Sequence, residues 1–400
     1  MLDVNKIRED FPFFKNSELV YFDNAATSLK PLLMIEELKR HYLSQSVNVN
    51  RGVYRLSQEV TERFDETREE VRKFINAESK DEIIFTKGTT DSLNFLALSF
   101  GELLKEGDEV IISEMEHHAN FVPWQILRDR KKVKLKMIPV DERGELDFDE
   151  FKKKLNAKTK LVSITWISNL LGTVNDIKKY IDEAHKAGAL VSIDGAQAVP
   201  HLKVDVRKYD IDFFSFSAHK MYGPTGVGVF YGKKKLLEKM PPVFGGGDMI
   251  DKVTFEKTTY NDLPHKFEAG TPNIADVIAF KKSIEYLNKT GLDNIASYEN
   301  ELLKYATEKL SNFEGLKIIG NSDNKSAIIS FIIEGVHPHD IGMLLDEKNI
   351  AVRTGHHCAQ PALNAFRLKA TARASFAFYN TKEEIDKFIL GIKYIYEIFK

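Results

Sequence analysis

Residues 161–194 read LVSITWISNLLGTVNDIKKYIDEAHKAGALVSID and contain one strand–helix–strand unit. Two short apolar runs, Leu161–Thr165 and Leu190–Asp194, flank a segment of helical periodicity at Lys178–Ala187, and Gly188 ends that helix. Because both runs are apolar on both faces, they fit parallel strands that helices cover on each side. This unit predicts an α/β fold.

The same alternation continues on both sides of the unit. Further strands are predicted at Glu82–Thr86, Glu109–Ser113, Leu135–Pro139 and Asp212–Ser217, and further helices at Thr90–Leu104 and Phe148–Leu155. From about Ile274 the pattern changes to longer helices, at Ala275–Leu287 and Leu292–Ser311, two strands, at Ala327–Ile333 and Ala370–Phe378, and a helix from Thr381. We therefore expect a large domain at residues 20–275 and a small α+β domain at residues 276–400, with residues 1–19 packed against the latter.

Composition and charge exclude several classes of protein. The chain has 400 residues and a net charge of −2, which gives no bulk attraction to nucleic acid or to an anionic membrane. No apolar run is long enough to cross a bilayer, and the N-terminus does not have the pattern of a secretory signal. The single cysteine, Cys358, excludes an intrachain disulfide. We expect a cytoplasmic protein.

Polar residues follow three of the predicted strands, where open α/β sheets bind their ligands. Lys87-Gly88-Thr89-Thr90 combines a glycine turn with a helix start, which suits a phosphate. Asp194 is placed to pair with a ring nitrogen, and Lys220, in Ser217-Ala218-His219-Lys220, would be a desolvated amine. Taken singly, these motifs also fit a capped turn, a helix-capping aspartate and a solvent-reaching lysine. Together they match a cofactor with a phosphate, a ring nitrogen and an aldehyde.

A second polar cluster, Arg353-Thr354-Gly355-His356-His357-Cys358, lies near the C-terminus. Its glycine and polar neighbours favour an exposed loop over a buried structural cysteine, and the nearby cationic groups would favour the thiolate. A metal site is the alternative. Three consecutive residues do not easily face one ion, however, and no second Cys/His pair has zinc-finger spacing. We expect no metal.

Two further positions have both a functional and a structural interpretation. In Glu116-His117-His118 an extended backbone would turn the histidines to opposite faces, so only one would meet a cofactor; the alternative is a histidine satisfied within its loop. Arg373 lies in an apolar strand pattern, and a buried arginine requires an anion. That anion is either a substrate carboxylate or an internal Asp or Glu.

The joint order of these motifs resembles group II, or SufS-like, cysteine desulfurases and selenocysteine lyases. These belong to the class V aminotransferase group of fold-type I pyridoxal-5′-phosphate (PLP) enzymes. The resemblance runs from Tyr21–Ala26 to Ser375–Asn380, and its most specific parts are Met115–Asn120, Asp194–Gln197, Ser217–Lys220, Phe267–Asn273 and Arg353–Cys358. It implies a large domain with a mostly parallel seven-stranded sheet and a smaller α+β C-terminal domain. The short cysteine loop is similar to that of group II.

The resemblance also implies a role for each site residue. Lys220 would carry the cofactor, Cys358 would accept sulfur, and His117 would stack on the ring and move protons. Asp194 would face the ring nitrogen and Gln197 the ring hydroxyl. The phosphate would be bound by Thr89, Thr90, Ser217 and His219, and by Thr271 from the neighbouring subunit. The substrate would be held by Asn169, Arg353 and Arg373, with Tyr54 nearby. Tyr54 and Asn50 stand where the family often has histidine, and a phenol does not titrate near neutral pH.

The implied activity is conversion of L-cysteine to L-alanine, with the sulfur transferred to Cys358 as a persulfide and used for iron–sulfur cluster assembly. The resemblance further implies a homodimer and a SufE-like or SufU-like acceptor protein. Three alternatives stay open at this point: a selenocysteine β-lyase, another class V aminotransferase or lyase, and a scaffold in a sulfur-transfer complex.

Overall fold

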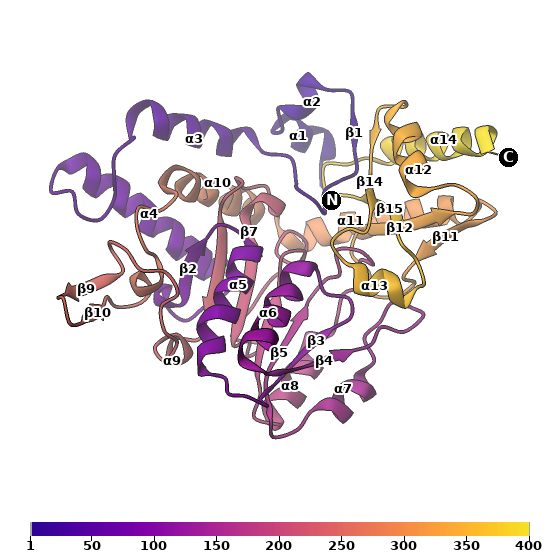
Figure 1. The fold of residues 1–400 in the computed structure, drawn as a ribbon. Helices are drawn as coiled ribbons and strands as arrows, with labels where there is room; N and C mark the ends of the chain where they lie inside the picture. The colour runs from indigo at the N-terminus through magenta and orange to yellow at the C-terminus, as the bar shows by residue number, and fades with distance from the viewer. Residues whose placement is uncertain (1, 400) are drawn as a thin grey trace.

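The computed structural model describes residues 2–399 (Figure 1). It contains a seven-stranded sheet in the order β2-β8-β7-β6-β5-β3-β4. The strands are β2 (Ile83–Thr86), β3 (Glu109–Ser113), β4 (Lys134–Ile138), β5 (Thr159–Thr165), β6 (Leu190–Asp194), β7 (Phe213–Ser217) and β8 (Gly228–Gly232). β8 is antiparallel to both of its neighbours, and the pairs from β7 to β4 are parallel. The expected mostly parallel α/β sheet is confirmed.

Helices cover both faces of this sheet because successive side chains of each strand point to opposite faces. In β3, Val110 and Ile112 join an apolar cluster with residues of α5 (Thr89–Ser99) and α6 (Val122–Lys131). Ile111, between them, joins a separate cluster with residues of α7 (Phe148–Lys154) and α8 (Ile177–Lys186). The apolar runs in the sequence are therefore strands buried on both faces.

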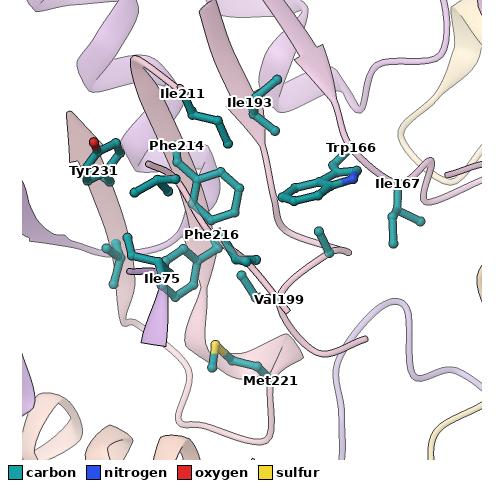
Figure 2. Packing of buried hydrophobic residues seen from close by; sticks show 14 of the residues in the cluster. Ile75, Trp166, Ile167, Ile193, Val199, Ile211, Phe214, Phe216, Met221 and Tyr231 are labelled. Carbon is teal, nitrogen blue, oxygen red and sulfur yellow. The ribbon is translucent and has the colours of Figure 1, made fainter. Parts of the chain in front are cut away.

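Strands β5, β6 and β7 pack against a dense layer of apolar side chains. Figure 2 shows Phe214 and Phe216 of β7 packed with Ile193 of β6 and with Trp166, which follows β5. All four side chains are at most 4% exposed. Burial of an aromatic or aliphatic side chain of this size contributes about 1.5–3 kcal/mol, so this layer fixes the strand ends firmly.

A second, antiparallel sheet has the order β11-β12-β15-β14. Its strands are β11 (Leu316–Ile319), β12 (Ile328–Ile333), β14 (Arg353–Gly355) and β15 (Thr371–Ser375), and its helices are α11 (Leu292–Leu310), α12 (Pro338–Asp346), α13 (Gln360–Ala365) and α14 (Lys382–Phe399). The core of this unit joins Phe331, Ala374 and Phe388. β14 forms one edge of the sheet.

The N-terminal segment contacts both units. β1 (Val20–Tyr21) pairs in parallel with β13 (Ile350–Ala351), and Val20 joins the core of the small unit. Arg8 bonds Glu384 of α14 at 2.8 Å, whereas Phe11 packs in the core of the large unit. The remaining elements are α1 (Val4–Glu9), α2 (Phe13–Asn16), α3 (Leu32–Ser44), α4 (Arg55–Phe74), α9 (Lys234–Leu237), β9 (Ile250–Val253), β10 (Thr258–Tyr260) and α10 (Ile274–Thr290).

The predicted division of the chain at residues 275 and 276 falls inside α10, which packs against α3 and α4. Val277 and Phe280 of this helix belong to the core of the large unit. The division stays a prediction. Within residues 2–399, no helix combines the length and the apolar character that a bilayer span requires.

Candidate active site

A cavity of about 330 Å³ lies at the carboxyl ends of the large sheet, with the loops around β14 and β15 forming its other wall. It brings together every predicted site residue except Thr271 and Tyr54. Those that line it are Thr89, Thr90, His117, Asn169, Asp194, Gln197, Ser217, His219, Lys220, Arg353, Cys358 and Arg373. Residues that are separated by up to 284 positions in the sequence (Thr89 and Arg373) therefore share one site.

The phosphate-binding prediction corresponds to the start of α5. Gly88, at φ 152°, precedes the helix, and a Cβ at Gly228 would lie 2.4 Å from the Cα of Gly88, so both positions require glycine. The Thr89 N–H donates to Ser217 Oγ at 2.7 Å, and the two hydroxyls lie 2.7 Å apart. A helix N-terminus with clustered hydroxyls is suited to a phosphate.

Asp194 supplies a buried carboxylate to the cavity. Asp194 ends β6 and is 3% exposed; its Oδ1 accepts from the Ala196 N–H at 2.9 Å. Burial raises the pKa of Asp194, and the nearby Lys220 amine opposes that rise. A cationic ring nitrogen would pair with this carboxylate and stabilise its charge. Gln197 lies beside it and donates through Nε2 to the Ala25 carbonyl at 2.7 Å.

Lys220 occupies the centre of the site, in the short 3-10 helix Ala218–Lys220 that follows β7. Burial lowers the pKa of Lys220 to about 8, although the charge of Asp194 partly offsets this effect. Among residues 2–399 its amine has no hydrogen-bond acceptor or salt-bridge partner. A substantial fraction of the side chain is thus a neutral amine near neutral pH, which nucleophilic attack on an aldehyde requires.

His117 lines the cavity and His118 does not, so one histidine of the pair reaches it, although His118 begins a short 3-10 helix and the backbone is not extended there. His117 Nδ1 accepts from the Ala119 N–H at 3.0 Å, which places the ring proton on Nε2. Burial lowers the pKa of His117 to about 3, so the ring is neutral. His118 points instead to the cysteine loop, where its Nε2 accepts from the Gln360 N–H at 3.2 Å.

Glu116 is a fully buried carboxyl behind His117 that sequence reasoning did not single out. Its oxygens accept from the Thr165 N–H at 2.9 Å and from Asn120 Nδ2 at 2.6 Å, and it also bonds Ser113. Burial raises the pKa of Glu116 to about 8. The sequence signal that could have identified Glu116 is its position directly before His117, within the family-like segment Met115–Asn120.

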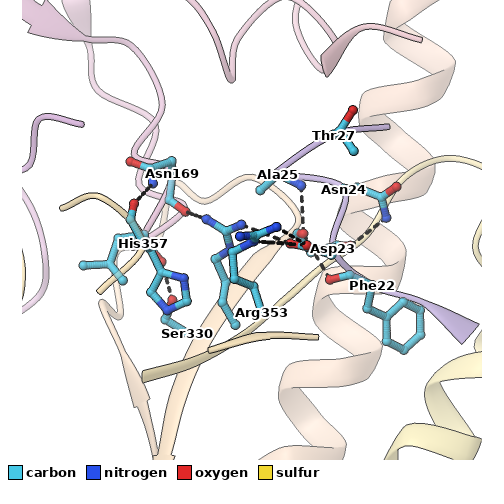
Figure 3. A network of polar contacts seen from close by, with 12 residues as sticks. Phe22, Asp23, Asn24, Ala25, Thr27, Asn169, Ser330, Arg353 and His357 are labelled. Carbon is cyan, nitrogen blue, oxygen red and sulfur yellow. Dashed lines mark hydrogen bonds and ion pairs between the residues drawn. The ribbon is translucent and has the colours of Figure 1, made fainter. Parts of the chain in front are cut away.

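Arg353 and Arg373 are cross-strand partners in β14 and β15, and both bond Asp23. Figure 3 shows Arg353 beside Asp23. Two nitrogens of Arg353 donate to the Asp23 carboxylate, Nε at 3.0 Å and Nη2 at 2.8 Å. Arg373, 2% exposed, donates to Asp23 Oδ1 at 3.3 Å and to the Asn169 carbonyl at 2.8 Å. The internal carboxylate, which the sequence left as one of two anions for Arg373, is therefore present.

Asp23 itself was missed by sequence reasoning, although it lies in the family-like segment Tyr21–Ala26. Burial lowers the pKa of Arg373 to about 10, and the negative charge of Asp23 counters that effect. Nε of Arg373 is buried without a hydrogen-bond partner among the described residues. Arg373 also lines the cavity, so its positive charge lies where a substrate carboxylate could bind.

Cys358 lies in the loop between β14 and α13, half-exposed, and lines the same cavity as Lys220. Its N–H donates to His356 Nδ1 at 3.0 Å, and its carbonyl accepts from the His118 N–H at 2.7 Å. Asn169 donates through Nδ2 to the His357 carbonyl at 2.7 Å and so ties this loop to the sheet (Figure 3). The loop holds the thiol at the cavity.

Thr271 and Tyr54 do not reach this cavity within one chain. Thr271 is exposed and lines a separate cavity of about 630 Å³ together with Lys87 and Gly226. Tyr54 is 52% exposed and directly precedes α4. Their assigned roles stay predictions. Thr271 was expected to bind the phosphate in the site of a neighbouring subunit.

The residues of the cavity fit pyridoxal phosphate. Its donors supply a helix N-terminus for a phosphate, a buried carboxylate for a ring nitrogen and a partly neutral lysine for an aldehyde, and its volume lies in the usual range for a small-molecule site. Asp194 Oδ2, which no group among residues 2–399 bonds, is the position where the ring nitrogen would donate.

The sequence is similar to a known family and to known enzymes. The model of the class-V aminotransferase family matches residues 20–388. A cysteine desulfurase of Synechococcus elongatus is 47% identical over 98% of this chain, which spans 64% of the length of that relative. A probable cysteine desulfurase of Staphylococcus aureus strain Mu50 is 48% identical over 99% of this chain and 98% of its own length.

Solved structures show the same relationship. The apo cysteine desulfurase of Thermococcus onnurineus superimposes with a TM-score of 0.95 at 37% identity, covering 99% of this chain and 98% of that one. The cysteine desulfurase CsdA of Escherichia coli gives a TM-score of 0.94 at 36% identity, with both chains fully covered. The expected PLP cofactor agrees with the family and with the donors in the cavity. The chain belongs to the class-V aminotransferase family, and the relatives it resembles over its full length are cysteine desulfurases.

Proposed function

We propose that the protein is a PLP-dependent cysteine desulfurase that converts L-cysteine to L-alanine and takes the sulfur onto Cys358. The observation that carries this proposal is that Lys220 and Cys358, 138 positions apart in the sequence, line one cavity of about 330 Å³. A lysine that attaches the cofactor and a lone thiol beside it are the two groups that removal of sulfur from an amino acid requires.

The groups of the sheet would hold the cofactor. Thr89, Ser217 and His219 would bind its phosphate, Asp194 would keep its ring nitrogen protonated, and Lys220 would attach it. When bound, PLP supplies an electron sink that makes the α-proton of the amino acid acidic. His117, neutral and fixed by the Ala119 N–H, would pack against the ring.

Residues of both walls would act on the substrate. Arg373 and Arg353 would hold the substrate carboxylate, with Asn169 positioning the loop. Lys220, once free, would remove the α-proton as a neutral amine. The Cys358 thiolate would attack the substrate sulfur; an S–S bond forms, the C–S bond breaks, and its electrons stay with the carbon skeleton. Protonation of the β-carbon and return of a proton to the α-carbon give L-alanine, and the sulfur remains on Cys358 as a persulfide.

The group II assignment and the physiological setting belong to the same proposal. β14 ends at Gly355 and α13 begins at Gln360, so the cysteine loop is short, which supports the SufS-like subtype. The half-exposed thiol would pass its sulfur to a small SufE-like or SufU-like acceptor for iron–sulfur cluster assembly. A cytoplasmic homodimer would complete the phosphate site with Thr271 of the second subunit.

One assay tests the proposed activity. The PLP-loaded protein is incubated with L-cysteine, and alanine, pyruvate and sulfide are measured with and without candidate acceptor proteins. Alanine in amounts equal to the sulfur recovered supports a desulfurase. Pyruvate as the product, or conversion of the cofactor to pyridoxamine phosphate without sulfur release, would instead show another class V activity.

A further inference from the structure

Three side chains at the outer rim of the cavity have the composition of a metal site. His118, His356 and Cys358 each offer one ligand atom, and these atoms all lie within 4.8 Å of one another. The sequence suggested the consecutive residues 356–358 as ligands and argued against them on geometry. The structure replaces His357, which is buried and bonded to Thr371, with His118 from the loop after β3.

Backbone hydrogen bonds hold the three side chains together. The His118 N–H donates to the Cys358 carbonyl at 2.7 Å, and the Gln360 N–H donates to His118 Nε2 at 3.2 Å. The Cys358 N–H donates to His356 Nδ1 at 3.0 Å. The two imidazole rings lie 5.6 Å apart between centroids, with 31° between their planes. The cluster therefore joins two separate segments of the chain in a fixed arrangement.

The donor set selects a class of cation. Two imidazoles and one thiolate are ligands of Zn²⁺ and similar borderline or soft cations, whereas Mg²⁺ and Ca²⁺ require oxygen ligands. Ligand lengths of about 2.0–2.3 Å place the donors of a tetrahedral site roughly 3.5 Å apart. Since the present separations are no more than 4.8 Å, side-chain rotations of about 1 Å close the site.

We propose that Zn²⁺, or a cation of the same class, binds reversibly to His118, His356 and Cys358. On binding, the thiol loses its proton to solvent and a metal–sulfur bond forms. The fourth position stays open to water, because His356 is exposed and the other two residues are half-exposed. On metal binding, each imidazole loses the backbone hydrogen bond that it accepts in the free protein, whichever of its two nitrogens binds the metal. The affinity for the metal is therefore lower than in a closed structural zinc site.

The consequence for activity rests on the proposed function. A sulfur atom that is bound to the metal cannot attack the sulfur of L-cysteine, so the cation would block persulfide formation. The site would thereby make sulfur release sensitive to free zinc. Binding itself does not depend on that function, because it involves neither Lys220 nor the residues that would hold the cofactor.

The direct test measures binding. Zn²⁺ is titrated into the PLP-loaded full-length protein in competition with a chromophoric chelator. We expect one high-affinity ion per chain, and at least about a tenfold loss of affinity in His118→Ala, His356→Ala and Cys358→Ala, since even groups that merely orient a ligand contribute 10–100-fold. His339→Ala, which removes an exposed histidine outside the cluster, serves as the control and should bind as the unchanged protein does.

Unchanged affinity in His118→Ala and His356→Ala, or an equal loss in His339→Ala, would overturn the proposal.

A second measurement separates the zinc site from the proposed function: alanine formation from L-cysteine at free Zn²⁺ concentrations set by a chelator buffer. Inhibition at the concentration that fills the site, reversed by EDTA, supports both. Zinc binding that needs all three residues, in a protein that forms no alanine, would refute the desulfurase and leave the metal site standing.

Discussion

The two walls of the cavity differ in how firmly the protein holds them. On the sheet side, Asp194, Ser217 and Thr89 are 3%, 4% and 6% exposed and follow strands that helices cover on both faces. On the other side, Arg353 projects from β14, an edge strand of three residues, and its side chain is 49% exposed. The sheet side is preorganised by burial, whereas Arg353 and Cys358 on the other side are open to solvent.

This difference matches what each wall would have to do. A cofactor that stays bound benefits from a rigid, desolvated set of partners. A thiol that receives sulfur and passes it on must be reachable from outside. Hydrogen bonds such as the one from Asn169 Nδ2 to the His357 carbonyl join the two walls, but the proposed roles of the walls are distinct. Substitutions on the two walls should therefore have separable effects.

The largest effect is expected on the sheet side, from Lys220→Ala. Without this amine the cofactor has no covalent attachment and the substrate has no base, so kcat/KM should fall by at least about 10³-fold. Borohydride treatment should no longer fix the chromophore to the protein. The exposed Lys208→Ala is the matched control, and a chromophore that is still trapped in Lys220→Ala would locate the attachment elsewhere.

Asp23→Asn tests how the arginines of β14 and β15 are held. The change keeps the shape of the side chain but leaves the buried Arg373 without a counter-charge, so the free energy of unfolding should fall by about 2 kcal/mol. Urea unfolding measures this quantity. Asp129→Asn, in an exposed pair with Arg128, should change it by less than about 0.5 kcal/mol. Equal effects of the two substitutions would mean that Asp23 does not hold the arginines.

Cofactor loading should depend on pH through Lys220. Burial lowers the pKa of this amine to about 8, so its neutral, reactive form increases as the pH rises and is nearly complete above that value. The rate of PLP incorporation into the apoprotein should rise about tenfold from pH 7 to pH 9 and then level off. An ordinary lysine would give a rise of about a hundredfold that continues beyond pH 9, and such a profile would contradict the buried, uncharged environment.

The smallest effect is expected at Tyr54. Its phenol is 52% exposed and lies outside the cavity of its own chain, so Tyr54→Phe should change KM for L-cysteine by less than about threefold, the loss of one ordinary hydrogen bond. Steady-state kinetics give this value. A larger change would show that the residue completes a site on a second subunit, and mixed dimers with one inactive chain would then locate that site.

Local pattern was sufficient to predict much of the large unit. β3 and β6 have the predicted bounds, because each is an apolar run between turn-forming segments. The helix predicted at Thr90–Leu104 instead ends at Ser99 and continues as a 3-10 turn. The antiparallel direction of β8 was not predictable, because periodicity gives the length of a strand but not its direction.

The candidate catalytic residues at the ends of strands could also be predicted from the sequence. Contacts between distant segments of the chain could not. Asp23 and Arg373 are 350 positions apart, and nothing local shows that they meet. The same holds for His118 and Cys358. Their contact joins two motifs that the sequence analysis considered separately. Such pairs depend on how the small unit sits on the large one.

The most direct test of the central claim is a single turnover. PLP-loaded protein in excess over L-cysteine is quenched, and alanine and the sulfur bound to the peptide containing Cys358 are counted. One persulfide at Cys358 for each alanine is the predicted result, with neither product formed when Cys358→Ala is used, although its chromophore is retained. Alanine formed while the Cys358 peptide remains unmodified would contradict the claim that this thiol takes the sulfur.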